Sequence, residues 1–247
     1  MSNSNPFGTS PYDNAGFGNY TAPATSMSPW QRRDPGIGQQ LKSRSRTRTG
    51  FTFAIGFVVV IWVVEFLNIL SGGRLSYYGI HPLDPSSLWH IATAPLLHAN
   101  FEHLIGNTIP AAIFCFIIGM GGKRVFWEVT LIVGLVAGIG TWLFGGVGTN
   151  HIGASGLIYG WLGYLIVRGV FNRDGKQILL GVALAFIYSG LFWGLLPTQP
   201  GVSWQGHLFG ALGGIAAGAF ITSDDPAALR ARKEQKKLEK RRRGLNR

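Results

Sequence analysis

Long apolar runs alternate with short polar connections along most of this chain. Beyond residue 50, six segments are long enough, or nearly so, to cross about 30 Å of hydrocarbon. The pattern predicts six transmembrane helices, over Phe51–Leu70, Phe101–Met120, Val125–Phe144, Ile152–Phe171, Ile178–Leu196 and Trp204–Ile221. The expected fold class is therefore all-α: a polytopic membrane protein with a six-helix bundle.

The two ends of the chain differ from this apolar centre. Residues 1–48 are rich in Ser, Asn, Gly, Pro and Thr and lack apolar periodicity, which predicts a disordered tail. Residues 223–247 form a basic tail, in which Ala227–Lys240 favours a helix with a thin apolar face. The membrane domain is expected over residues 49–222.

The composition supports this assignment. Only 13% of the 247 residues are charged, whereas about a quarter are charged in a typical soluble domain. The single cysteine, Cys115, lies in an apolar run, so an intrachain disulfide is excluded and a buried filler thiol is the simplest interpretation.

The distribution of positive charge predicts the orientation. Of the 22 Lys and Arg residues, all but Arg74 fall in the tails or in the connections on the same side as the tails. Positive residues are retained on the cytoplasmic side, so both termini are expected there. The net charge of +11 then reflects topology and a basic tail that anionic lipid would attract, and it gives no argument for a nucleic-acid partner.

The first external connection, Ser71 to Asn100, is much longer than the other two external loops. It contains Tyr77, Tyr78 and Trp89, and such aromatic residues favour the membrane interface. The loop is expected to lie partly in the headgroup layer.

Polar residues inside the predicted spans are few, and they gather near the outer starts of the second, fourth and sixth segments. With a rise of 1.5 Å per residue, His103, Ser155 and His207 lie about 3–5 Å beyond their helix starts. Three segments that are distant in sequence therefore present these side chains to one shallow cavity.

The residue types at this depth are those of nucleophilic catalysis. Ser155 follows a small-residue turn, Gly153-Ala154, and is the candidate nucleophile, with His207 as its general base. No acidic residue is placed to complete a triad, so a Ser–His dyad is the simpler arrangement. Tyr159, four residues after Ser155 on the same helix face, is placed to stack on His207 and help orient it.

A tetrahedral intermediate also requires donors for its negative oxygen. His103 and Asn107 are spaced i, i+4 on one helix face, and each has a side-chain N–H to offer. The backbone N–H of Ser155, at a helix start, is a further candidate, and Gly153 supports the turn there. The alternative is that His103 and Asn107 tie the long loop to the helix.

Small residues favour a close approach of the fourth and sixth segments. Glycines recur at 156, 160 and 163 in one segment and at 206, 210 and 214 in the other. Close helix contact would bring Ser155 within hydrogen-bonding reach of His207.

Together these stretches resemble the rhomboid family of intramembrane serine proteases. The stretches that carry the resemblance are His98-Ala-Asn-Phe-Glu-His103-Leu-Ile-Gly-Asn107, Gly153-Ala-Ser155-Gly-Leu-Ile-Tyr159-Gly and Gly206-His207-Leu-Phe-Gly210-Ala-Leu-Gly-Gly214. The resemblance implies Ser155 and His207 as the catalytic pair, His103 and Asn107 near the oxyanion, and Tyr159 against the histidine. It implies membrane-protein substrates, no cofactor and, from the six-helix form, a bacterial cell membrane.

The resemblance also implies a lateral substrate gate on the fifth helix, including Phe192 and Trp193. One departure lies in the long loop, where the family often has Trp-Arg and this chain has Trp89-His90. The anchoring of the loop at this point is therefore open, while no proposed reacting group is affected.

Three other functions compete with a serine protease. A zinc protease would need His-Glu-x-x-His on a helix, which the sequence around His98 and His103 does not supply, so no metal is expected. A non-catalytic rhomboid-like adaptor that binds transmembrane helices would usually lack the serine or the histidine. A transporter would favour paired broken helices in corresponding halves, and no convincing pair is present.

Overall fold

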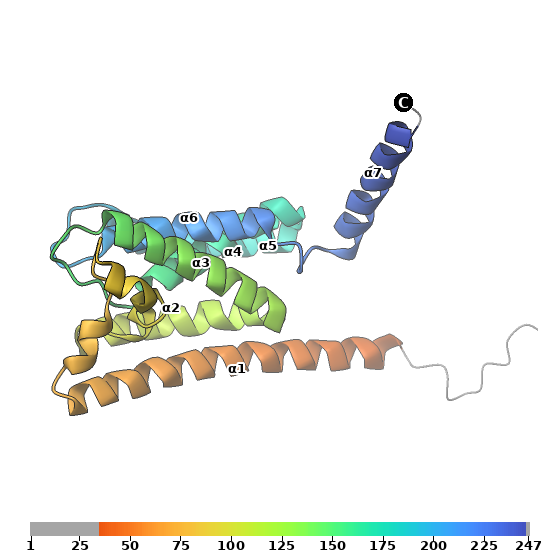
Figure 1. Cartoon of the computed structure of the whole chain (residues 1–247). Helices are drawn as coiled ribbons and strands as arrows, with labels where there is room; N and C mark the ends of the chain where they lie inside the picture. The colour runs from red at the N-terminus through yellow and green to blue at the C-terminus, as the bar shows by residue number, and fades with distance from the viewer. Residues whose placement is uncertain (1–34, 246–247) are drawn as a thin grey trace, which may run out of the picture. The chain divides into compact units, whose positions relative to one another are not determined.

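The structure is a computed structural model that describes residues 35–245, and all regular structure in that range is helical (Figure 1). The longer helices are α1 (Pro35–Leu70), α2 (Phe101–Met120), α3 (Lys123–Phe144), α4 (Ser155–Asn172), α5 (Gly175–Ile187), α6 (Trp204–Phe220) and α7 (Ala227–Leu245). Short 3-10 helices are η2 (Arg74–Tyr78), η3 (Pro85–Ile91), η4 (Ala94–Leu96) and η5 (Ser189–Leu195). The all-α prediction is confirmed for these residues. Among the described residues, 35–41 belong to a separate unit, and the helix bundle belongs to the unit from Lys42 onward.

Three of the described helices are long and apolar enough to cross a membrane. They are α1, through its stretch Ser43–Leu70, and the whole of α2 and of α3. The bent pair of α5 and η5 makes a fourth if the pair is one span. Helix α6 has only 17 residues, and Arg168 and Asn172 lower the hydropathy of α4. These two helices lie in the centre of the bundle, where neighbouring helices rather than lipid cover much of their surface.

Two predicted boundaries are wrong. Helix α1 begins at Pro35, so residues 35–48 are helical where the sequence suggested disorder; residues 1–34 of that tail lie outside the described residues. The predicted helix Ile178–Leu196 is broken, because α5 ends at Ile187 and the following η5 is bent from it by 68°. Ser189 and Gly190 stand at this break, and both are weaker helix formers than the residues before them.

The centre of the bundle is the contact between α4 and α6, which pack side by side, with α3 against α6 (Figure 1). Glycines make this contact possible. A Cβ atom on Gly210 would overlap the carbonyl oxygen of Gly156, and one on Gly214 would overlap the carbonyl oxygen of Gly160. The two backbones therefore touch directly, as small residues allow in membrane helices.

The long loop between α1 and α2 is folded onto the ends of the helices. The indole of Trp142 donates to the carbonyl of Asp84 over 2.9 Å, and Ile80 forms an isolated antiparallel bridge with His151. Within the loop, His90 is 4% exposed and its Nδ1 donates to the carbonyl of Gly79 over 2.7 Å. His90 stands where the family that the sequence resembles often has arginine. It therefore ties one part of the long loop to another.

The connection between α6 and α7 is fixed by buried charges. The Arg168 guanidinium, from α4, forms ion pairs with Asp224 and Asp225 and donates to the carbonyl of Gly218 over 2.8 Å. The hydroxyl of Tyr164 donates to Asp224 over 2.7 Å. We call this group the Arg168 cluster; it holds the chain to the core where it leaves α6.

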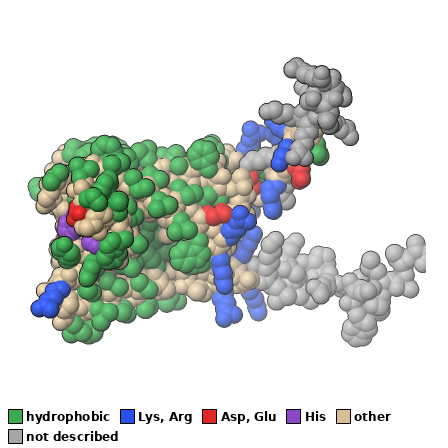
Figure 2. Space-filling view, viewed as in Figure 1, with side chains coloured by type: hydrophobic (Ala, Val, Ile, Leu, Met, Phe, Trp, Pro, Cys, Tyr) green, Lys and Arg blue, Asp and Glu red, His purple; other side chains and the backbone are tan. Residues whose placement is uncertain are grey.

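Charged and histidine side chains separate along the helices. Figure 2 shows most Lys and Arg side chains near one end of the bundle, with the visible histidines at the other. We call these the basic end and the histidine end. The helices between them carry exposed apolar side chains, including Phe66, Ile109 and Leu131.

Candidate active site

Ser155 is the first residue of α4, three residues closer to the helix start than predicted, and stands directly after a glycine turn. Gly153 has φ of 126°, a conformation that L side chains rarely adopt, and a Cβ atom there would lie 2.5 Å from the His103 ring. The turn therefore requires glycine for two reasons. It leaves the N–H groups of the first turn of α4 without acceptors inside the helix.

His207, in the first turn of α6, faces Ser155. Its Nε2 lies 2.8 Å from Ser155 Oγ, and its Nδ1 lies 2.8 Å from the carbonyl oxygen of Gly194. A carbonyl oxygen only accepts hydrogen bonds, so Nδ1 carries the proton. In the neutral ring Nε2 is then the acceptor, and Ser155 Oγ–H donates to it.

Tyr159 lies flat against the same imidazole. The two ring centroids are 4.1 Å apart and the planes differ by 8°. The Tyr159 hydroxyl donates to the carbonyl of Leu191 over 2.7 Å. Both Leu191 and Gly194 belong to η5, so this segment holds His207 directly and also through Tyr159.

Sequence reasoning did not identify Gly194. Because no acidic residue was available, the sequence did not identify a partner for His207 Nδ1. A backbone carbonyl cannot be recognised from residue types, since every residue has one. A Cβ atom on Gly194 would overlap the Tyr159 hydroxyl and lie 3.1 Å from His207 Nδ1, so the glycine itself is a consequence of this contact.

The two candidate oxyanion donors lie on α2, beside the turn. Asn100 caps α2 by accepting from the backbone N–H of His103 over 2.8 Å, and the His103 ring lies against Gly153. Asn107 is 6% exposed, and its amide donates to the carbonyl of His103 over 2.9 Å. One of its two amide hydrogens is thus engaged, and the other remains for a further acceptor.

His98 stands behind His103 and is fully buried. The ring centroids of the two histidines are 5.1 Å apart in an edge-to-face arrangement. Burial, and to a smaller extent the neighbouring His103, lowers the pKa of His98 to about 4. His98 is therefore neutral at ordinary pH and serves as packing behind the site.

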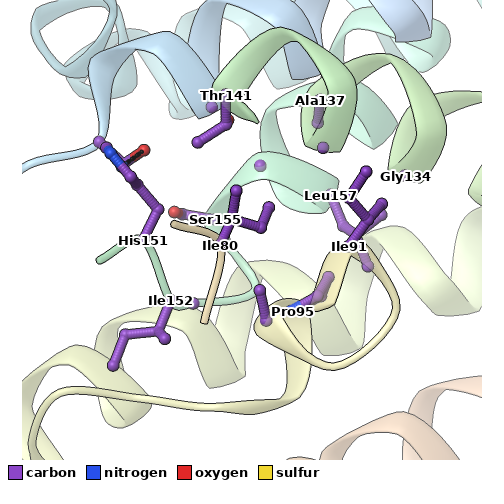
Figure 3. A pocket seen from close by; sticks show the side chains of 16 residues that line it. Ile80, Ile91, Pro95, Gly134, Ala137, Thr141, His151, Ile152, Ser155 and Leu157 are labelled. Carbon is purple, nitrogen blue, oxygen red and sulfur yellow. Dashed lines mark hydrogen bonds between the residues drawn. The ribbon is translucent and has the colours of Figure 1, made fainter. Parts of the chain in front are cut away.

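A cavity of about 40 Å³ adjoins Ser155 (Figure 3). Its walls include Ile91 and Pro95 from the long loop and Thr141 from α3. His151 also lines it, a residue that the sequence analysis did not identify. It is half-buried, its Nδ1 lies 2.7 Å from Ser203 Oγ, and burial lowers its pKa. Sequence spacing could not place it, because its partner is 52 residues away.

Most of this chain is similar in sequence to known proteins. A model of the rhomboid domain matches residues 85–224, which is more than half of the chain. An uncharacterised protein of Mycobacterium tuberculosis is 41% identical over 223 residues, covering 82% of this chain and 93% of that protein.

The chain belongs to the rhomboid family.

Two more distant relatives carry names that state an activity. YdcA of Bacillus subtilis, named as a candidate rhomboid protease, is 30% identical over 175 residues, which cover 66% of this chain and 84% of that protein. The rhomboid protease GluP of the same organism is 28% identical over 180 residues, covering 69% of this rhomboid and 35% of GluP.

The side chains suggested as a gate stand on η5 of this rhomboid. Phe192 and Trp193 are 57% and 61% exposed, and their ring centroids are 5.9 Å apart. They lie next to Gly194, whose carbonyl holds His207. The segment that presents these aromatic rings at the surface is thus the one that orients the imidazole.

In the described part of this rhomboid, no three His, Cys, Asp or Glu side chains are grouped so that they could hold a metal ion. The site is built from a hydroxyl, an imidazole and hydrogen-bond donors.

Proposed function

We propose that this rhomboid is a serine endopeptidase that hydrolyses peptide bonds in or near transmembrane segments of other membrane proteins. The observation that carries the proposal is the chain of hydrogen bonds from Ser155 Oγ to His207 Nε2 and from His207 Nδ1 to the Gly194 carbonyl, each 2.8 Å long. It gives the serine a base in the correct tautomer without an acidic residue.

In the proposed reaction, Ser155 Oγ attacks the substrate carbonyl carbon and its proton passes to His207 Nε2. The C–N bond then breaks, and His207 returns that proton to the leaving amine. Water, deprotonated by His207, hydrolyses the acyl-enzyme and regenerates Ser155. The imidazolium formed in each half is stabilised by the Gly194 carbonyl on one edge and the Tyr159 ring on one face.

The negative oxygen of each tetrahedral intermediate requires nearby donors. The backbone N–H of Ser155, at the start of α4, is one candidate, and the His103 ring, which lies against Gly153, is a second. The second amide hydrogen of Asn107 is the third candidate donor. Gly153 contributes by letting the turn approach His103.

The substrate segment must unwind for its carbonyl to be attacked, because a helical carbonyl is hydrogen-bonded and shielded. Helix-weakening residues near the cut are therefore expected. The cavity beside Ser155, about 40 Å³, accommodates a small side chain or a few water molecules, which favours a small residue at the cut site. Entry past Phe192 and Trp193 would require movement of η5.

The proposal includes the placement in the membrane. Helices α1 to α6 would each cross a bacterial cell membrane, with both termini in the cytoplasm, since the Lys and Arg side chains gather at the basic end (Figure 2). The basic α7 would then lie near anionic lipid.

The experiment that tests the proposal is labelling with a fluorophosphonate probe in liposomes, with Ser155→Ala as the matched variant. A reactive serine is expected to bind the probe in the native chain, and both labelling and cleavage of a model transmembrane substrate are expected to vanish in Ser155→Ala. Gly106→Ala is a suitable control, because a Cβ atom there meets nothing within 4 Å. Equal cleavage by the native chain and Ser155→Ala would overturn the proposal, and absence of labelling and cleavage from both would favour an adaptor.

A further inference from the structure

A large apolar groove separates α1 from α3 beneath the long loop. Its volume is about 900 Å³, and its walls include Gly56 and Val60 on α1, Trp89 and Ile91 on the loop, and Trp127 and Leu135 on α3. Helix α1 is loosely packed, with only 22% of its most apolar stretch buried. The groove is therefore open along a helix that offers most of its surface to lipid.

The hydroxyl groups in the lining of the groove do not require a polar occupant. Thr52 and Thr130 are the two hydroxyl-bearing residues in its lining, and both hydroxyls are already hydrogen-bonded. Thr52 donates to the carbonyl of Arg48 over 2.9 Å, and Thr130 accepts from the indole of Trp161 over 3.2 Å. An apolar occupant therefore leaves neither of these hydroxyls without a hydrogen bond.

The size of the groove suits flexible chains better than a helix. A spanning helix about 10 Å wide and 30 Å long fills roughly 2,400 Å³. The groove has about 900 Å³, so it would hold only part of a substrate helix or of a helix from a second copy. Acyl chains, which adapt to an irregular channel, fit this volume.

Basic side chains stand at one end of both walls. Arg48 precedes Thr52 by one turn of α1, and Lys123 precedes Trp127 by one turn of α3, and both basic residues are exposed. The rings of Phe53 and Phe126 also line the groove, and they stack with centroids 3.8 Å apart. Two cations next to an apolar groove suit a phospholipid. Its phosphodiester would bind the cations while its acyl chains lie in the groove.

We propose that this groove is a binding site for an acidic phospholipid. The acyl chains lie between α1 and α3 beneath the long loop, and the phosphate lies between Arg48 and Lys123 at the basic end.

The lipid site shares a wall with the candidate active site. Ile91, Pro95, Gly134 and Leu157 line both the groove and the small cavity beside Ser155. Ile91 is seated on α3 at Gly138, where any Cβ atom would collide with it. A lipid in the groove therefore supports this wall from behind, and faster cleavage with bound lipid is expected. That consequence rests on the proposed function, whereas lipid binding does not.

The test uses the purified full chain in phosphatidylcholine vesicles that contain increasing amounts of phosphatidylglycerol brominated on its acyl chains. Bromine in the groove quenches the fluorescence of Trp89 and Trp127, so saturable quenching is expected. Each basic residue near a lipid phosphate contributes about a fivefold factor, so Arg48→Gln with Lys123→Gln is expected to weaken binding roughly 30-fold. Gly56→Phe fills the groove from a position with no neighbour within 4 Å of its Cβ and is expected to abolish saturable quenching.

Matched controls separate this site from general attraction to the surface. Arg46→Gln with Lys176→Gln removes the same charge from exposed positions outside the groove, and Val59→Phe adds the same ring to a part of α1 outside it. Both are expected to bind within twofold of the native chain. Equal weakening by the two charge pairs, unchanged quenching in Gly56→Phe, or equal binding of brominated phosphatidylcholine would each overturn the proposal.

Binding is measured in the Ser155→Ala background and cleavage is measured with Ser155 intact, which keeps the two proposals distinct. Saturable binding, with cleavage absent even where Ser155 is present, would support the lipid site and contradict the protease. Normal cleavage with no saturable binding would do the reverse.

Discussion

At the scale of single residues, the site depends on which atom of the imidazole carries the proton. The carbonyl of Gly194 fixes hydrogen at Nδ1, and this leaves Nε2 free to accept from Ser155. An aspartate would do the same and would add a charge, but burying that charge in a membrane bundle is costly. A backbone carbonyl supplies the orientation and avoids that cost.

The burial of His98 predicts how stability depends on pH. Its pKa falls from about 6.5 in the unfolded chain to about 4 in the fold, so the unfolded state binds the proton first. Neutral His98 makes its full contribution to the free energy of unfolding above pH 6.5. As the pH falls towards 4, the free energy of unfolding decreases by roughly 1–3 kcal/mol.

Thermal unfolding in detergent between pH 7 and pH 4.5 measures this loss. His98→Gln is expected to lower the midpoint at pH 7 but to flatten its decline with acid, whereas His81→Gln in the outer loop is expected to keep the native slope. An equally steep decline in His98→Gln would assign the acid sensitivity to other groups.

At the scale of elements, the short η5 segment positions both the proposed gate side chains and the imidazole of His207. It bends away from α5, presents Phe192 and Trp193 at the surface, and supplies the carbonyls that hold Tyr159 and His207. Any movement of η5 that admits a substrate therefore also loosens the imidazole. Opening of the proposed gate and orientation of the base are coupled through two hydrogen bonds.

Tyr159→Phe tests this coupling, because it removes the bond to Leu191 and keeps the ring stack. Loss of one neutral hydrogen bond, about 1 kcal/mol, predicts a kcat about fivefold lower with KM nearly unchanged. Steady-state cleavage of a model substrate in liposomes gives both constants. A change confined to KM would mean that the bond serves substrate binding and not the imidazole.

At the scale of the whole molecule, the helices separate two polar regions. The dyad lies at the histidine end, and the Arg168 cluster ties α4 to the connection before α7 on the far side of the apolar core. The hydrogen bonds and ion pairs of each region are formed within that region. Substitutions in the Arg168 cluster are therefore expected to lower the free energy of unfolding before they affect the dyad.

Arg168→Met leaves Asp224 and Asp225 without the guanidinium that holds them, and breaking a buried ion pair costs about 3–5 kcal/mol. A correspondingly lower free energy of unfolding in detergent is expected. Adding Asp224→Asn and Asp225→Asn is expected to recover part of the loss, because the two negative charges that Arg168 pairs with are then gone. Lys176→Met, at an exposed position, is the control, and an equal effect from it would contradict a structural role for the cluster.

The sequence by itself determined the all-α class, the ends of α2, and the position of Ser155 and His207 near the starts of two helices. These follow from local properties: apolar run length, glycine spacing and the rise of a helix per residue. Only the tertiary structure decided what orients His207, where η5 breaks from α5, and that His151 belongs to the cavity wall. Backbone carbonyls are the same in every residue, and the partners of these groups are brought together by packing, so no pattern along the chain records them.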